Sequence, residues 1–121
     1  MDSLPSPKAG TTAGEQLAAV TNGIVRLFSE YYGRGPTKAK SYILDDRIVV
    51  CVLEDTMTTV EKTLAENGHG DKVRQVRITF QETMAHEFKR IVAECMGRNV
   101  IAYHSQLALD PDIGFEFFVL D

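Results

Sequence analysis

Apolar residues recur at every third or fourth position in two long stretches of the chain, and this spacing predicts two amphipathic helices. The first stretch carries its apolar face on Leu17, Val20, Ile24, Leu27, Phe28 and Tyr31. Thr12 and Glu15 match a capping box at its start, and Gly33 is suited to end it because glycine readily adopts a positive φ. The second stretch begins at Asp71 and carries Val73, Val76, Phe80, Met84, Phe88, Ile91 and Cys95. We expect both stretches to bury one face in a common core.

A shorter helix is expected before the second stretch. Thr58 and Glu61 form another capping-box match, and the two glycines in segment 68–70 would end this helix near Asn67. The helix from Asp71 would be roughly 40 Å long at about 1.5 Å per residue, which is more than one small sheet needs to cover it. We therefore expect part of its apolar stripe to meet a second subunit.

Two pairs of β-forming segments predict two hairpins. The first joins residues 39–44 to residues 47–53, and the second joins residues 100–109 to residues 115–120. The element order is then αββααββ. This order predicts an α+β fold in which the helices are layered on a four-stranded antiparallel sheet.

The segment 48–53 is apolar at every position, so both faces of this strand should be covered. Helices would cover one face, and a partner subunit would cover the other. A symmetric homodimer is therefore expected, with Val50 and Phe118 as candidate interface residues. Helices divided between both faces of the sheet would instead allow a monomer.

Composition narrows the class of protein. The chain has 121 residues, which fits a single domain over residues 11–121 after a disordered lead-in over residues 1–10. Its formal net charge of −4 argues against binding to nucleic acid or to anionic lipid. The sequence shows neither a signal-peptide pattern nor an apolar run long enough for membrane insertion. Cys51 and Cys95 lie in apolar surroundings and are expected to be buried thiols in a cytoplasmic protein.

A Gly-Arg pair precedes each hairpin, so the chain resembles a weak repeat of two halves. Arg34 lies between Gly33 and Gly35, and Arg98 follows Gly97. If the halves are related by symmetry, the two arginines would converge on a small anion such as bicarbonate or phosphate, with the neighbouring glycines lining the site. The alternative is that each arginine stabilises the carbonyl groups at the end of the preceding helix.

Other reactive residues do not form a recognised catalytic or metal-binding pattern. Glu82 and His86 are four residues apart, but two ligands do not make a zinc site. The acidic turn 110–114 lacks the ligands of a calcium loop. His104 beside Ser105 suggests at most a hydrolase, and a histidine bonded to backbone on a sheet face is the simpler interpretation. We therefore expect no catalytic residue, metal or cofactor.

Several of these elements together resemble the MpsC-like domain family. The resemblance rests on residues 33–36 (Gly-Arg-Gly-Pro), residues 58–62 (Thr-Thr-Val-Glu-Lys), Arg77 in the long helix, and residues 97–98 (Gly-Arg), and it covers residues 16–120. This chain has Met57 where the family usually has leucine. The resemblance implies a small cytoplasmic protein, encoded in some bacteria beside a membrane system for inorganic-carbon uptake or membrane-potential generation. It transfers no catalytic residues.

Two functional hypotheses follow. The first is a non-enzymatic accessory or regulatory module that acts through protein contacts with a membrane inorganic-carbon or ion uptake system. The second is a sensor of a small anion or ligand that uses Arg34 and Arg98.

Overall fold

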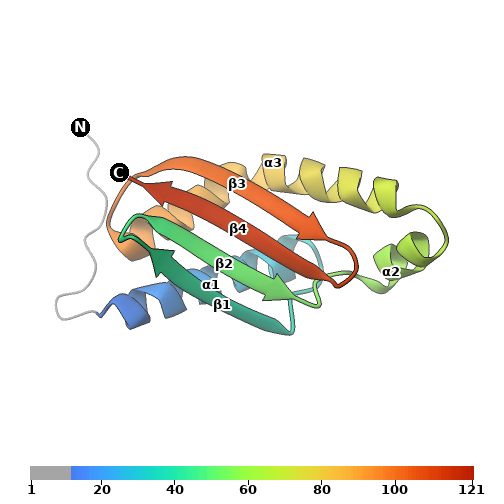
Figure 1. The fold of residues 1–121 in the computed structure, drawn as a ribbon, viewed down its shortest axis with the longest axis horizontal. Coiled ribbons are helices and arrows are strands. Elements are labelled where there is room, and N and C mark those ends of the chain that lie inside the picture. Colours follow the sequence, from blue (N-terminus) through green and yellow to red (C-terminus); the bar gives the residue numbers. More distant parts are fainter. Residues whose placement is uncertain (1–11) are drawn as a thin grey trace.

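The computed structural model describes residues 12–121, which form three helices and a four-stranded antiparallel sheet (Figure 1). The elements are α1 (Ala13–Tyr31), β1 (Lys38–Leu44), β2 (Ile48–Glu54), α2 (Thr59–Glu66), α3 (Gly70–Met96), β3 (Val100–Ala108) and β4 (Ile113–Leu120). The predicted α+β fold and its element order are confirmed. The predicted lead-in over residues 1–10 lies outside the described residues.

Local sequence signals set the ends of the helices. Thr12 and Thr58 each accept a hydrogen bond from the backbone N–H of a glutamate three residues later, at 3.1 Å in both cases, and each glutamate side chain accepts one in return. Both capping boxes are therefore present. At the other end, Gly97 caps α3 with a φ of 66°, and Gly33 follows the end of α1 with a φ of 86°, values that favour glycine.

The strand order is β1-β2-β4-β3, so the two hairpins lie side by side with their second strands in the centre. The register pairs Val50 with Phe117 and Cys51 with Glu116 across the central β2–β4 contact. Because β2 and β4 are antiparallel, a rotation of half a turn about an axis through this contact relates the paths of the two halves.

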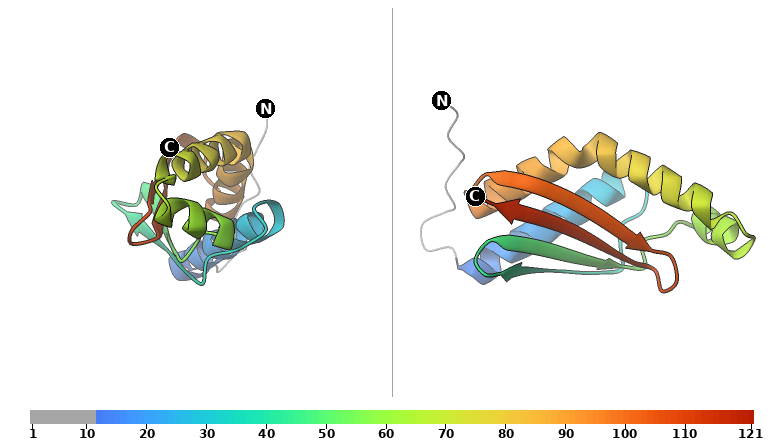
Figure 2. Two further views of the ribbon diagram at one scale, coloured as in Figure 1. Left: turned by 90° about the vertical axis from the view of Figure 1, so that its right-hand side faces the viewer. Right: turned by 45° about the horizontal axis from the view of Figure 1, so that its top comes forward.

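Helices α1 and α3 pack together on one face of the sheet, as the end-on view in Figure 2 shows. Their contact is close at Gly23, where a Cβ would lie 2.6 Å from Ile91 Cγ2. The core between helices and sheet contains stacked or tilted aromatic rings and a larger set of aliphatic side chains. Its fully buried members include Val20, Ile24, Val49, Cys51, Phe88, Val92, Phe118 and Leu120.

Three positions differ from the predicted faces. Tyr31 and Val76 were expected in the core but are 58% and 55% exposed. Tyr31 is the last residue of α1, and the next residue, Tyr32, packs against the core instead. Arg77 takes the buried position beside Val76. Phe118 was expected at a subunit interface, but it is fully buried beneath the helices because it shares a strand face with Leu120.

Candidate functional site

Arg34 joins the end of α1 to the loop that follows β2. Its guanidinium donates to the Asp55 carboxylate at 2.8 Å and also to the backbone carbonyl of Met57. Lys62 reaches the other oxygen of the same carboxylate at 3.3 Å. The hydrogen bond from Arg34 is the main cause that lowers the pKa of Asp55 to about 2. Arg34 therefore serves as a connection between a helix end and a strand end.

Arg98 makes the equivalent connection in the second half. It donates to the backbone carbonyl oxygens of Asp46 and Asp121, at 2.6 Å in both cases. Asp121 follows β4 as Asp55 follows β2, so each arginine binds the residue after the second strand of its own hairpin. The sequence predicted that these arginines bind an anion or the carbonyl groups at the end of the preceding helix. Their hydrogen bonds instead connect the segment after each helix to residues at the ends of the strands.

The structure does not bring the two arginines together. Arg34 lies at the Glu54 end of β2, whereas Arg98 lies at the Asp46 end of the same strand, across the length of the sheet. The rotation that relates the halves reverses strand direction, so equivalent residues far from its axis must lie at opposite ends. Anion binding by these residues stays a prediction from the sequence, without a shared site.

The two glycines predicted with Arg34 have different structural roles. Gly33 has the positive φ described above, and no other residue lies within 4 Å of the place its Cβ would take. Gly35 lies close to α1, and a Cβ there would require the Ser29 side chain to turn away. Both residues shape the turn from α1 into β1.

A buried ion pair links α2 to α3. Arg77 is 2% exposed and donates to both carboxylate oxygens of Glu61, at 2.8 Å and 2.9 Å. It also donates to the Thr56 carbonyl at 2.7 Å, and its guanidinium lies 4.1 Å from the centre of the Tyr32 ring. Burial acts to raise the pKa of Glu61, but hydrogen bonds from Arg77 and Tyr32 outweigh it and hold the pKa below its usual range. All described charges of this cluster are partnered.

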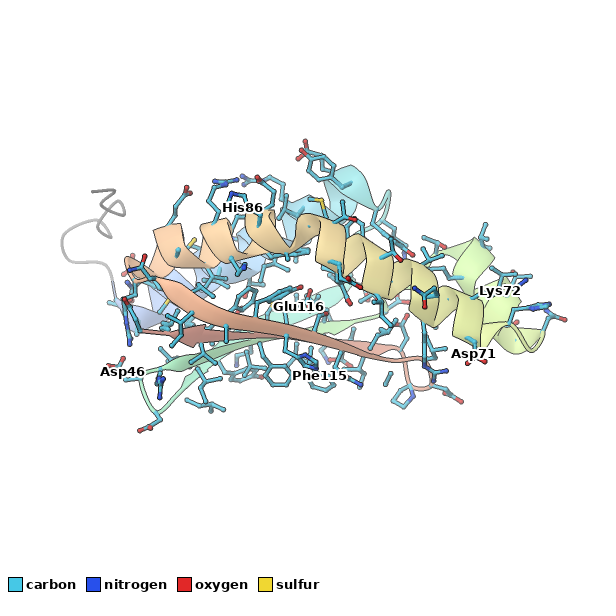
Figure 3. All side chains as sticks on the ribbon, turned by 90° about the horizontal axis from the view of Figure 1, so that it is seen from above. Asp46, Asp71, Lys72, His86, Phe115 and Glu116 are labelled. Atoms are coloured by element: carbon cyan, nitrogen blue, oxygen red, sulfur yellow. The ribbon has the colours of Figure 1, made fainter. Side chains whose placement is uncertain are left out.

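A row of polar side chains crosses the helix-covered face of the sheet. The register aligns Ser41, Cys51, Glu116 and Ser105 across the four strands. Glu116 is 1% exposed, and Figure 3 shows it between the sheet and α3. It accepts hydrogen bonds from Tyr103 Oη at 3.0 Å and from Ser105 Oγ. Burial raises the pKa of Glu116 to about 7 despite these bonds. This carboxyl group was not singled out by its sequence pattern.

The opposite face of the sheet is apolar, and no described element covers it. Phe115 points to this side in Figure 3, away from Glu116. Around it the alternating strand positions place Val50, Val52, Phe117 and Val119, with Ile48, Leu44 and Tyr42 further out. Tyr42 and Leu44 are 44% and 53% exposed. We refer to this surface as the open sheet face. The predicted one-sided helix layer is thus what the structure shows.

The remaining candidates do not form a catalytic arrangement in the described part of the chain. His104 approaches Gln106 at 3.3 Å, whereas Ser105 points to the other face of β3 and donates to Glu116. Burial raises the pKa of the Cys51 thiol to about 11. Within residues 12–121 no group of three or more His, Cys, Asp or Glu side chains is arranged to hold a metal ion.

The model of one protein family matches the whole described part of the chain. It is described as "Na+-translocating membrane potential-generating system (MpsC)" and matches residues 12–121. The chain belongs to the MpsC family. No curated protein and no solved structure matches the chain. None of the helices in the described range is long and apolar enough to cross a membrane.

Most of the residues that carry the MpsC resemblance lie in one connected network, whereas Arg98 lies at the other end of the sheet. Arg34 and Lys62 both bind Asp55, and Thr58 caps the helix whose Glu61 pairs with Arg77. These contacts join the end of the first half to α2 and α3. In this chain the residues of this network thus hold its elements together, and the open sheet face is a separate surface.

Proposed function

We propose that this protein is a cytoplasmic accessory or regulatory module that acts through protein contacts in a membrane potential-generating system and has no enzymatic activity of its own. The observation that carries the proposal is the open sheet face, since soluble proteins rarely leave a continuous apolar surface of this kind without a partner. The family description supplies the membrane system. The formal net charge of −4 disfavours nucleic acid as the partner.

The open sheet face has the composition of a protein interface. Its centre is formed by aliphatic and aromatic residues, with the Phe115 and Phe117 rings stacked at 6.1 Å. Its rim carries Lys40, Glu54 and Gln106 at alternating strand positions. An apolar centre with a polar rim is typical of interfaces between proteins.

A second copy of the chain is the first occupant of this face that we propose. The face has the approximate twofold pattern of the sheet, with Val50 and Phe117 at its centre. In most homodimers the same surface patch of both copies meets across a twofold axis, and the open sheet face would be that patch. The sequence also predicted that part of the apolar stripe of α3 meets a second subunit. A dimer through the open sheet face does not involve α3, because α3 lies on the other face of the sheet.

Sedimentation at micromolar concentration tests the homodimer. The wild-type chain should sediment with twice the mass of 13.5 kDa. Phe117→Asp should yield a folded monomer, because an unpaired carboxylate inside an apolar interface costs several kcal/mol. Val60→Asp on α2 is the control, since Val60 is 68% exposed and lies away from the face. A wild-type mass near that of one chain would rule out the dimer.

The accessory role has its own test. Purification of the tagged protein from native membranes solubilised in mild detergent should recover an integral membrane component of the potential-generating system. Recovery of no membrane component under any growth condition would contradict this role, even if the protein is a dimer.

A further inference from the structure

The two outer edges of the sheet differ in how they are protected. An edge strand has backbone N–H and C=O groups available to another strand, and lysines on an edge discourage such pairing. Edge strand β1 carries Lys38 and Lys40. Edge strand β3 is longer, with nine residues, and its sequence VIAYHSQLA contains no Lys, Arg, Asp, Glu or Pro. The β3 edge therefore lacks this chemical protection.

A groove of about 710 Å³ runs along the β3 edge beneath α3. Five consecutive residues of β3, from Tyr103 to Leu107, line it. Side chains alternate between the two faces of a strand, so a groove lined by consecutive residues follows the edge of the strand itself. The unpaired backbone of β3 thus forms the floor of the groove.

Helix α3 forms the wall of the groove. Its lining residues recur at helical spacing on one side of the helix: Arg74, Arg77, Ile78, Gln81, Glu82, Ala85 and Lys89. Ile78 is 48% exposed there. From Arg74 to Lys89 the helix rises roughly 22 Å. An extended chain of about six or seven residues has this length.

The charges along the wall restrict what fits. Arg74 and Lys89 lie at its two ends, with Ile78 and Ala85 between them. Arg77 also lines the wall, but it is buried and its charge is paired with Glu61. Arg74 has only a 3.7 Å ion pair with Asp71, whose side chain is fully exposed, so this pair is weak. Glu82 near the centre disfavours an acidic residue at that point. The groove suits a segment that is apolar in its middle and acidic at both ends.

We infer that the β3 edge binds an extended segment of a partner protein as a fifth strand, with apolar side chains packed between Ile78 and Ala85 and acidic side chains near Arg74 and Lys89. A second copy of β3 is a poorer occupant, because it has no acidic residue to meet these cations. The inference deepens the proposed function by naming the surface and the chemistry of one protein contact. This surface is separate from the open sheet face.

A synthetic seven-residue peptide is the probe. It has aspartate at positions one and seven, valine at three and five, and threonine at the even positions, so one face presents both acids and both valines. Fluorescence anisotropy should show saturable binding, and hydrogen exchange should show new protection of β3 amides in the complex. A peptide N-methylated at alternate residues should not bind, because strand addition depends on backbone hydrogen bonds.

Variants of α3 locate the site. Ile78→Glu should weaken binding at least about fivefold, whereas Val76→Glu, at a position 55% exposed and outside the groove lining, should not change it. Arg74→Glu combined with Lys89→Glu should reject the acidic peptide and accept one with lysine at both ends.

Any one of three peptide-binding results would overturn the inference: no binding at about 1 mM peptide, equal binding of the N-methylated peptide, or equal weakening by Ile78→Glu and Val76→Glu. Self-association through β3 would also overturn it, and would appear as protection of β3 amides without peptide. The peptide experiment is independent of the open sheet face, so it can fail while the Phe117→Asp experiment succeeds, and the reverse.

Discussion

The two halves of this molecule follow one plan but differ where they meet and at their outer edges. In each half a helix ends near a glycine with positive φ, an arginine follows, and a hairpin completes the unit. Arg34 binds the residue after β2, and Arg98 binds the residue after β4. The comparison shows that a repeated sequence feature need not build one shared site, because only residues near the symmetry axis approach their counterparts.

Near that axis the halves have unlike chemistry. Cys51 on β2 lies opposite Glu116 on β4, and each has a serine on its outer side, Ser41 and Ser105 respectively. One half places a thiol in the core and the other places a carboxyl group. The Glu61–Arg77 pair joins α2 to the first turns of α3, in the segment between the two hairpins. The halves therefore differ most in their buried charges.

The largest expected effect on stability comes from breaking the buried Glu61–Arg77 ion pair, which lies between the two hairpins. Arg77→Met should destabilise the protein by about 3–5 kcal/mol, because it leaves the Glu61 carboxylate buried without its partner. Chemical denaturation monitored by circular dichroism measures this loss. Arg74→Met, one turn earlier and with a side chain 52% exposed, should change stability by less than about 0.5 kcal/mol. Equal losses in both variants would show that the pair contributes nothing specific.

Glu116→Gln tests the buried carboxyl group of the second half. Because the folded pKa of about 7 exceeds the ordinary value of 4.5, the folded state holds this proton more tightly than the unfolded state does. The wild type should therefore lose stability as pH rises from about 4.5 to about 7, by an amount on the order of 3 kcal/mol. Glu116→Gln should remove this loss, so the variant should gain relative to wild type at pH 8. Parallel stability curves for the two proteins over this range would contradict the assignment.

Replacing the two junction glycines tests whether the halves are equivalent. Gly33→Ala and Gly97→Ala should each cost about 1 kcal/mol, because both require a positive φ that alanine adopts unfavourably. Gly14→Ala is the control, because Gly14 lies in the first turn of α1 and should gain up to about 1 kcal/mol from helix propensity. Thermal unfolding measures all three. If only one of the two glycine substitutions lowered the stability, the two helix-to-hairpin junctions would not be equivalent.

Most of the fold was predictable because its signals are local. Capping boxes, apolar spacing and the two hairpins depend on residues close in sequence. These predictions are confirmed, except that Tyr31 and Val76 lie outside the core. The burial of Arg77 was not predictable from α3 alone, since it depends on Glu61 from another helix. The burial of Glu116 did have a signal, because it alternates with Phe118 and Leu120 on one strand face. The groove at β3 was not predictable, because it depends on how far α3 extends over the edge of the sheet, and sequence patterns do not give the position of a helix relative to a strand.

The smallest expected effect on stability comes from the edge lysines. Lys38 has only a 3.9 Å ion pair with Glu54, and Lys40 lies 5.3 Å from the centre of the Tyr42 ring, so both contacts are weak. Lys38→Thr combined with Lys40→Thr should therefore leave the free energy of unfolding within about 0.5 kcal/mol of wild type. The same change removes the charges that protect the β1 edge, so light scattering should show association beyond the wild-type state as concentration rises. Arg26→Thr combined with Lys72→Thr, at two exposed helix positions that do not line the β3 groove, is the control for the loss of two positive charges, and it should leave association unchanged. If both double variants associate equally, the loss of positive charge alone causes the association. The lysines of β1 would then have no specific role in preventing the β1 edges of two molecules from pairing.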